Sequence, residues 1–164
     1  MDKNYILSPE VAEKKMKRMA YEILENNFGE QEFILAGIRD KGLVIARNIQ
    51  ALLNGISKIS TELLSVNLDK NNPQVVTLDK QISLRDKVIL LIDDVSNSGR
   101  TLLYALKPFL NTDLRKVQTL VLVERSHNAF PVKPDYVGLS VATTLQEHIV
   151  VEVEGDLVKG AWLE

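Results

Sequence analysis

Residues 88–92 form a run of five apolar side chains that ends in two adjacent carboxylates, Asp93 and Asp94. An apolar run without alternation is typical of a strand that is buried on both faces, as in the centre of a parallel sheet. Open α/β sheets bind their ligands at the carboxyl ends of such strands. The run therefore predicts a central strand with two carboxylates at a ligand-binding edge.

A short segment rich in hydroxyl groups follows the two aspartates and opens a helix that we expect over residues 101–109. Backbone N–H groups and hydroxyls at such a turn attract phosphate, whereas carboxylates accept hydrogen bonds from sugar hydroxyls. The pattern predicts a site for a phosphorylated ribose. The alternative is a plain strand-to-helix turn with an aspartate as N-cap, which explains one aspartate but not two and the loop. The residues of the segment are Ser96, Asn97, Ser98, Gly99, Arg100 and Thr101.

A second glycine-containing segment, EFILAGIRDKG at residues 32–42, also joins an apolar strand to a helix. Glycine lets the backbone approach a ligand, and Arg39 and Lys41 offer positive charge to a polyanion. A triphosphatase P-loop would need lysine after Gly42, where this chain has Leu43. A strand-to-helix turn with solvated charges remains the alternative for this segment taken alone.

These segments resemble two motifs of the type I phosphoribosyltransferases, namely the phosphoribosyl pyrophosphate (PRPP) motif at residues 88–101 and the pyrophosphate loop at residues 37–42. Residues 120–141 contain Arg125, His127, Pro131 and the run Asp135–Gly138, which resemble a signature of the members that are both pyrimidine attenuation regulators and uracil phosphoribosyltransferases. In type I enzymes this region belongs to the hood over the nucleobase. The resemblance covers most of the chain.

The resemblance implies a type I fold: an α/β protein with a doubly wound, mainly parallel sheet, flanking helices and a small hood. It also implies roles for individual residues. Asp93 and Asp94 would be the catalytic acids that engage the ribose hydroxyls, and residues 96–101 would bind the 5′-phosphate of PRPP. Pyrophosphate would be bound by Arg39, Asp40, Lys41 and Gly42, and the base by Arg125 and the backbone at Val137. Enzymes of this family have a long mobile loop that closes over the sugar. The corresponding segment here, residues 67–86, is short, and Lys70 at its tip would stand where relatives have an arginine.

The implied reaction transfers ribose 5-phosphate from PRPP to a nucleobase, with uracil first, and with Mg²⁺ as the cofactor. The alternative is a non-catalytic or weakly catalytic regulator of pyrimidine genes that senses a nucleotide and binds RNA. Lys14, Lys15, Lys17 and Arg18 would give the first helix a basic face for RNA. Asp40 and Lys41 stand where relatives have a Thr-Arg pair, so the pyrophosphate loop here carries a carboxylate. We expect a homo-oligomer, with a dimer first.

The amino-acid composition bears on the number of domains, on RNA binding, on metal sites and on the location of the protein. The 164 residues with 45% hydrophobic content predict one domain, residues 1–164, with a buried core. The net charge of −2 predicts no broad nucleic-acid field, so RNA binding would be weak. The chain has no cysteine for disulfides or thiolate sites, and His127 and His148 lack the neighbours of a metal site. Without an apolar run of membrane-spanning length or a signal-peptide core, we expect a cytoplasmic protein with no membrane partner.

The expected elements follow from apolar periodicity and from helix start and stop signals. Ser8 and Pro9 begin a helix that Gly29 can end, with a buried face of Ala12, Met16, Met19, Ala20 and Ile23. Further helices are expected at 43–53 and 101–109. Strands are expected at 33–36, 60–68, 88–92, 117–123, 136–141 and 149–153.

Overall fold

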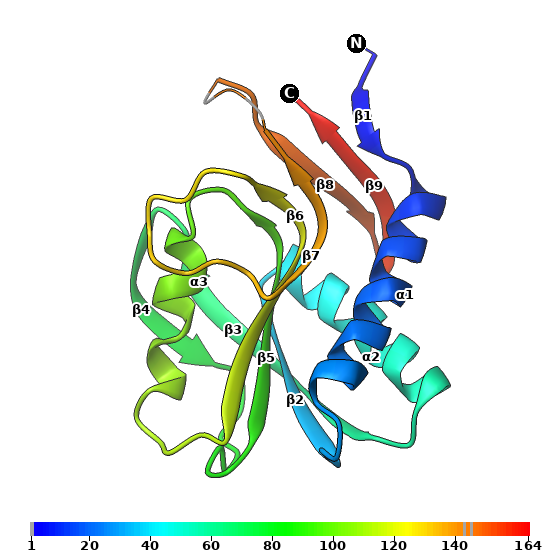
Figure 1. Cartoon of the computed structure of the whole chain (residues 1–164). Helices are drawn as coiled ribbons and strands as arrows, with labels where there is room; N and C mark the ends of the chain where they lie inside the picture. The colour runs from blue at the N-terminus through cyan, green and yellow to red at the C-terminus, as the bar shows by residue number, and fades with distance from the viewer. Residues whose placement is uncertain (1, 143, 145) are drawn as a thin grey trace.

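A six-stranded sheet with helices on both faces forms the body of the protein in the computed structural model, which describes residues 2–142, 144 and 146–164 (Figure 1). Only the β3–β4 pair is antiparallel, so the sheet is mainly parallel, as expected. In spatial order its strands are β4 (Asn72–Leu78), β3 (Ser60–Asp69), β2 (Glu32–Ile38), β5 (Val88–Ser96), β6 (Lys116–Arg125) and β7 (Tyr136–Val141).

Two long helices pack on one face of this sheet. Helix α1 (Pro9–Asn26) begins where Ser8 Oγ accepts a hydrogen bond from the N–H of Val11 at 3.2 Å, and its buried side is the five-residue face that the sequence predicts. Helix α2 (Lys41–Ile56) follows β2. On the opposite face lie α3 (Arg100–Ala105) and the 3₁₀ turn η1 (Lys107–Phe109), so the single helix expected over 101–109 is divided into two short pieces. No helix among the described residues is long and apolar enough to span a membrane.

A second, three-stranded antiparallel sheet forms the hood. It consists of β1 (Asn4–Leu7), β9 (Leu157–Leu163) and β8 (Ile149–Glu154) in that order, so it joins the two ends of the chain (Figure 1). Gly160 has φ +126°, and a Cβ there would lie 2.2 Å from the carbonyl oxygen of Leu7. The expectation that residues 120–141 belong to the hood was wrong, because β6 and β7 are strands of the main sheet.

The short segment between β3 and β5 contains a further strand that the sequence did not predict. Residues 72–78 form β4, which pairs with β3 through Val66–Leu78, Asn67–Thr77 and Asp69–Asn72. Lys70 and Asn71 are therefore the two residues of a tight hairpin turn. Pro73 lies on this edge strand, where a missing N–H costs no ladder hydrogen bond.

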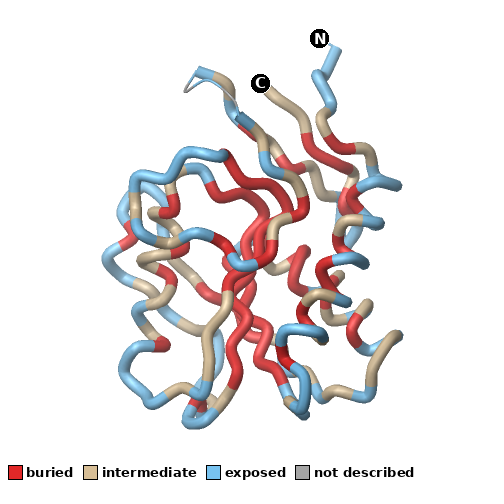
Figure 2. Tube along the Cα trace, viewed as in Figure 1, coloured by how far each residue is buried: buried red, intermediate tan, exposed pale blue. Residues whose placement is uncertain are grey.

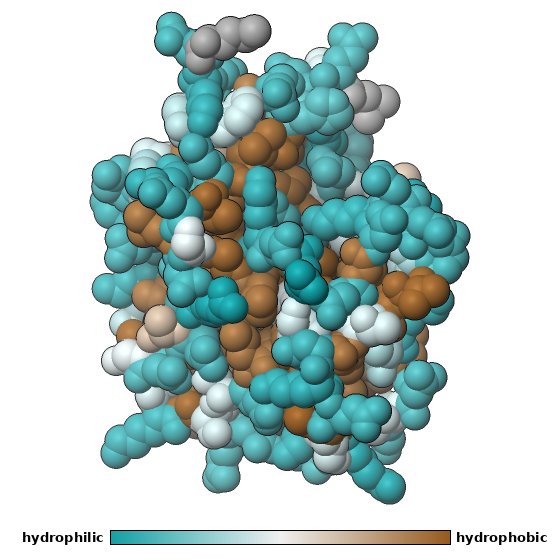
Figure 3. All heavy atoms as spheres, turned by 180° about the vertical axis from the view of Figure 1, so that it is seen from behind, coloured by the Kyte–Doolittle hydropathy of each residue, from teal (hydrophilic) through white to brown (hydrophobic). Residues whose placement is uncertain are grey.

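The core follows the main sheet from end to end (Figure 2). Every residue of β5 is buried, which confirms the central strand predicted from its apolar run. Seen from behind, apolar side chains gather in a broken band down the middle of the molecule, and hydrophilic side chains surround the band (Figure 3).

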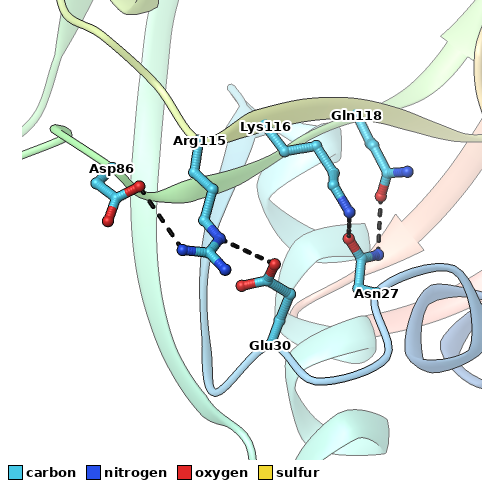
Figure 4. A network of polar contacts seen from close by, with 6 residues as sticks. All are labelled: Asn27, Glu30, Asp86, Arg115, Lys116 and Gln118. Atoms are coloured by element: carbon cyan, nitrogen blue, oxygen red, sulfur yellow. Dashed lines mark hydrogen bonds and ion pairs between the residues drawn. The ribbon is translucent and has the colours of Figure 1, made fainter.

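A network of polar side chains lies at the amino-terminal ends of the strands of the main sheet (Figure 4). The Asn27 amide donates to Gln118 Oε1 at 2.8 Å, and Lys116 Nζ donates to Asn27 Oδ1 at 2.9 Å. Arg115 lies 3.0 Å from Glu30 and 3.7 Å from Asp86. These contacts connect the end of α1 to the start of β6, so the network has a structural role. It lies at the end of the sheet opposite Asp93.

Candidate functional site

The site lies where the order of the strands reverses. From β2 the chain continues through α2 to β3 on one side, and from β5 it continues through α3 to β6 on the other side. Such a switch point leaves a crevice at the carboxyl ends of the strands. Gly37 on β2 pairs with Ile92 on β5, so the segment after β2 lies beside Asp93 and Asp94.

Asp93 and Asp94, which we call the acid pair, are buried at this edge. Asp93 is 0% exposed and Asp94 is 7% exposed. Asp93 Oδ1 accepts a hydrogen bond from the N–H of Asp94 at 2.8 Å, and its other oxygen, Oδ2, lies 3.3 Å from Lys70 Nζ. The same ammonium lies 3.7 Å from Asp94 Oδ1. Lys70 therefore bridges both carboxylates.

The electrostatics of the acid pair follow from this burial. Loss of water and the neighbouring Asp94 carboxylate raise the pKa of Asp93 well above its usual range, and the Lys70 ammonium opposes that rise. Partial burial lowers the pKa of Lys70, but the two carboxylates outweigh it and hold this pKa above its ordinary value. The two carboxyl groups are thus kept close together in a place that has little water to stabilise a charge on Asp93.

Residues 96–101, from the last residue of β5 into α3, are the segment for which the sequence predicts phosphate binding, and we call this segment the phosphate loop. Its shape depends on Gly99, which has φ +87° and whose added Cβ would lie 2.8 Å from the carbonyl oxygen of Val132. The carbonyl of Ser98 accepts the N–H groups of Ala129 and Phe130, both at 3.0 Å. Ser96 Oγ is buried and has no hydrogen-bond partner among the described residues. A hydroxyl in that state is available to a ligand.

One cavity of about 320 Å³ joins the phosphate loop to Asp94 and Lys70. Ile149, the first residue of β8, brings the hood to the same cavity, and no local pattern in the sequence predicted this contact. The cavity is lined by Lys70, Asp94, Val95, Ser96, Asn97, Ser98, Gly99, Arg100, Thr101, Leu102 and Ile149.

The segment after β2 packs tightly against the acid pair. A Cβ on Gly42 would lie 2.8 Å from the carbonyl oxygen of Ile92 and 3.0 Å from Asp93 Oδ1, so only glycine fits at the start of α2. Arg39 Nε lies 3.2 Å from Asp40 Oδ1 in an exposed ion pair. The carboxylate that departs from the family pattern is thus paired within its own loop.

A second hollow of about 410 Å³ lies beside this loop. It is lined by Arg39, Asp40, Asn67, Leu68 and Asp69, which places the end of β3 next to residues 39–40. Asn67 Oδ1 is buried without a partner among the described residues. The acid pair, the phosphate loop and residues 39–42 are therefore grouped at one edge of the sheet.

Arg125 and Val137 lie one and two strands further along. The Arg125 guanidinium donates to the carbonyls of Thr144 and Glu147, so it fastens the connection that leads to the hood. Its Nε is buried without a partner among the described residues. The Val137 carbonyl accepts a hydrogen bond from Arg18 at 2.9 Å, a contact that the sequence did not reveal. Both residues have structural contacts, and their role toward a base stays a prediction.

The fold and this edge define an α/β protein of the type I phosphoribosyltransferase class. A model of the phosphoribosyl transferase domain matches residues 5–155, and the chain belongs to this family. The bifunctional protein PyrR of Clostridium acetobutylicum is 32% identical over 160 residues, which cover 92% of this chain and 90% of that protein. The bifunctional protein PyrR of Enterococcus faecalis is 31% identical over 163 residues, covering 94% and 92%.

Solved structures of related fold include two purine enzymes. The hypoxanthine phosphoribosyltransferase of Trypanosoma cruzi superposes with a TM-score of 0.80 at 12% identity, covering 99% of this chain and 96% of that chain. A hypoxanthine-guanine phosphoribosyltransferase of Bacillus anthracis gives 0.74 at 20% identity, covering 92% and 88%. At these identities the likeness concerns the fold alone, and it confirms the fold expected from the sequence.

Proposed function

We propose that this protein transfers ribose 5-phosphate from PRPP to a nucleobase nitrogen and releases pyrophosphate. The observation that carries the proposal is the cavity in which Asp94, Lys70 and the phosphate loop meet. A ligand with hydroxyls at one end and a phosphate at the other matches this lining, because carboxylates accept from hydroxyls and the loop offers hydroxyl and N–H donors to an anion.

Each group of residues in the site has its own role in this reaction. Asp93 and Asp94 accept hydrogen bonds from the ribose hydroxyls and orient the ring, and residues 96–101 hold the 5′-phosphate. Arg39 and Lys41 attract the pyrophosphate. When the bond from ribose C1 to pyrophosphate breaks, positive charge develops on the ring, and two nearby carboxylates in a dry environment stabilise that charge. The protein contributes position and electrostatics, and it needs no side-chain nucleophile.

Mg²⁺ fits this arrangement as a cofactor that arrives with the ligand. Among the described residues, no group of three or more His, Cys, Asp or Glu side chains is placed to hold a metal ion. Mg²⁺ is commonly bound by one or two carboxylates together with substrate phosphates and water. Asp93 and Asp94 supply such oxygens, and the pyrophosphate and ribose hydroxyls would supply the rest. Bound there, the metal would neutralise charge on the leaving group.

Uracil is the base that we propose, on the resemblance of residues 125–138 to the pyrimidine regulators. The test is the formation of nucleoside monophosphate from PRPP and Mg²⁺ with uracil, guanine, hypoxanthine or adenine offered separately. We expect the highest kcat/KM with uracil. A higher value with any purine contradicts the uracil assignment, and the phosphoribosyl transfer itself is contradicted if none of the bases reacts.

A nucleotide-sensing regulator is the second candidate. It is favoured by one structural observation, namely that the short segment of residues 67–86 is folded into the β3–β4 hairpin. The name "bifunctional protein" of the PyrR relatives is consistent with both candidates. Binding of UMP without any transfer from PRPP would favour the regulator.

A further inference from the structure

The connection between β6 and β7 lies against the phosphate loop. Its residues 128–132, which we call the brace, contact that loop at two points. At the first, the N–H groups of Ala129 and Phe130 both donate to the Ser98 carbonyl at 3.0 Å. At the second, Gly99 lies so close to Val132 that an added Cβ would be 2.8 Å from the Val132 carbonyl oxygen. The phosphate loop is therefore supported by a segment that is distant from it in the sequence.

The side chain of Asn128 closes the brace. Its Nδ2 donates to the Val132 carbonyl at 3.1 Å, so the two ends of the brace are joined. Pro131 lies between them, and its ring fixes one backbone dihedral. Asn128 is exposed and is not among the residues that line the cavity. Its side chain can therefore act on a ligand in the cavity only through the brace.

The brace determines which way the peptide between Ser98 and Gly99 faces. This peptide is trans, and a planar trans peptide directs its C=O and its N–H to opposite sides. Because the brace holds the Ser98 carbonyl, the Gly99 N–H faces away from the brace, and it donates to none of the described residues. Gly99 lines the cavity together with Ser96, whose buried Oγ also has no partner among the described residues. Two hydrogen-bond donors are thus available to a ligand there.

We propose that the brace positions the phosphate loop for the 5′-phosphate of the ribose ligand and that Asn128, which closes the brace, is a positioning residue. The inference rests on the proposed phosphoribosyl site. A carbonyl turned toward the ligand would repel phosphate oxygens, whereas an N–H donates to them. Because the Ser98 carbonyl is held on the brace, the Gly99 N–H is ready for the phosphate before the ligand binds, and this peptide need not turn.

The first test needs no ligand. Asn128→Leu keeps a side chain of similar size but removes the amide donor. We expect the amide hydrogens of Ala129 and Phe130 to exchange with solvent about fivefold faster in this variant, because the brace opens more often. The control is Asn111→Leu, which changes an exposed asparagine that follows η1. Amide NMR of the full chain measures the exchange, and rates that equal those of the unaltered protein would overturn the role of Asn128.

The second test is calorimetric titration of ribose 5-phosphate into the same proteins. We expect Asn128→Leu to weaken binding by about fivefold, the net worth of one hydrogen bond, and the control to bind normally. The NMR signal of the Gly99 amide proton should move when the ligand binds, because this N–H gains an anionic acceptor. Unchanged affinity in Asn128→Leu, an equal loss in the control, or a Gly99 signal that does not respond would overturn the proposal.

A further variant and a folding check complete the tests. Asn128→Ala repeats both measurements without an added apolar side chain and should give the same result as Asn128→Leu. Circular dichroism checks that each variant is folded. If the unaltered protein binds neither ribose 5-phosphate nor PRPP, the proposed function fails, and the exchange rates alone then decide whether Asn128 holds the brace.

Discussion

A negative charge on Asp93 lowers the stability of the ligand-free protein. It is fully buried beside a second carboxylate, and these two causes raise its pKa well above the value of 3.8 that the free side chain has. Asparagine keeps the oxygen that accepts the N–H of Asp94 but carries no charge. We therefore expect Asp93→Asn to increase the free energy of unfolding of the ligand-free protein near neutral pH by about 1–2 kcal/mol.

The sign of the pH dependence follows from the same shift. As pH rises above 3.8, the unfolded carboxyl loses its proton first while the folded one keeps it. The unfolded state then binds fewer protons, so this group lowers stability progressively until pH passes its raised folded-state pKa. Urea unfolding with EDTA at several pH values, for the protein and for Asp93→Asn, measures this. The stability gained by the variant should grow with pH across this window, and parallel curves would contradict the account.

Gly42 packs against both the backbone of β5 and the side chain of Asp93. Because an added Cβ would lie 2.8 Å from the Ile92 carbonyl oxygen and 3.0 Å from Asp93 Oδ1, we expect Gly42→Ala to cost about 1–3 kcal/mol of stability. It should also weaken ligand binding, since Asp93 would have to move. Gly55→Ala on the same helix is the control, because a Cβ there meets nothing within 4 Å. Thermal unfolding and calorimetry measure both effects, and equal behaviour of the two variants would be a contradiction.

At the scale of helices and strands, the sequence predicted the elements whose residue pattern lies within the element itself. The unbroken apolar run of β5 and the Ser8 cap with the buried side of α1 are confirmed. Strands β1 and β9 were not predicted, because they pair with each other from opposite ends of the chain and each is stabilised by its distant partner. Edge strand β4, with Pro73 and an exposed pattern, also lacks an apolar signature.

The candidate site likewise has parts that the sequence predicted and contacts that it did not. The acid pair, the phosphate loop and residues 39–42 were named from the sequence because each lies in one continuous motif. The bridge from Lys70 to Asp93 was not predictable, since it depends on the register of the β3–β4 hairpin. The contact of Arg18 with the Val137 carbonyl likewise joins residues that are 119 positions apart.

At the scale of the whole molecule, charge limits the affinity for RNA. The net charge is −2, and Arg18 is engaged with Glu22 and the carbonyls of β7. We expect weak binding to a pyrimidine-operon leader RNA that falls steeply with salt, because the remaining lysine contacts to phosphate are replaced by ions. Filter binding at low and near-physiological salt, with and without UMP, measures this. Tight, sequence-specific and UMP-dependent retention at the higher salt would contradict it.

The central claim is that the acid pair exists to bind a phosphoribosyl ligand and not to support the fold. Calorimetric titration of PRPP with Mg²⁺, and of UMP, into the double variant Asp93→Asn, Asp94→Asn tests it most directly. The control is Glu62→Gln, Asp156→Asn, which removes two carboxylates from the exposed ion pairs with Lys80 and Arg47. The account predicts that the acid-pair variant stays folded and loses affinity by about 100-fold or more, while the control binds normally. A folded acid-pair variant with unchanged affinity would contradict it.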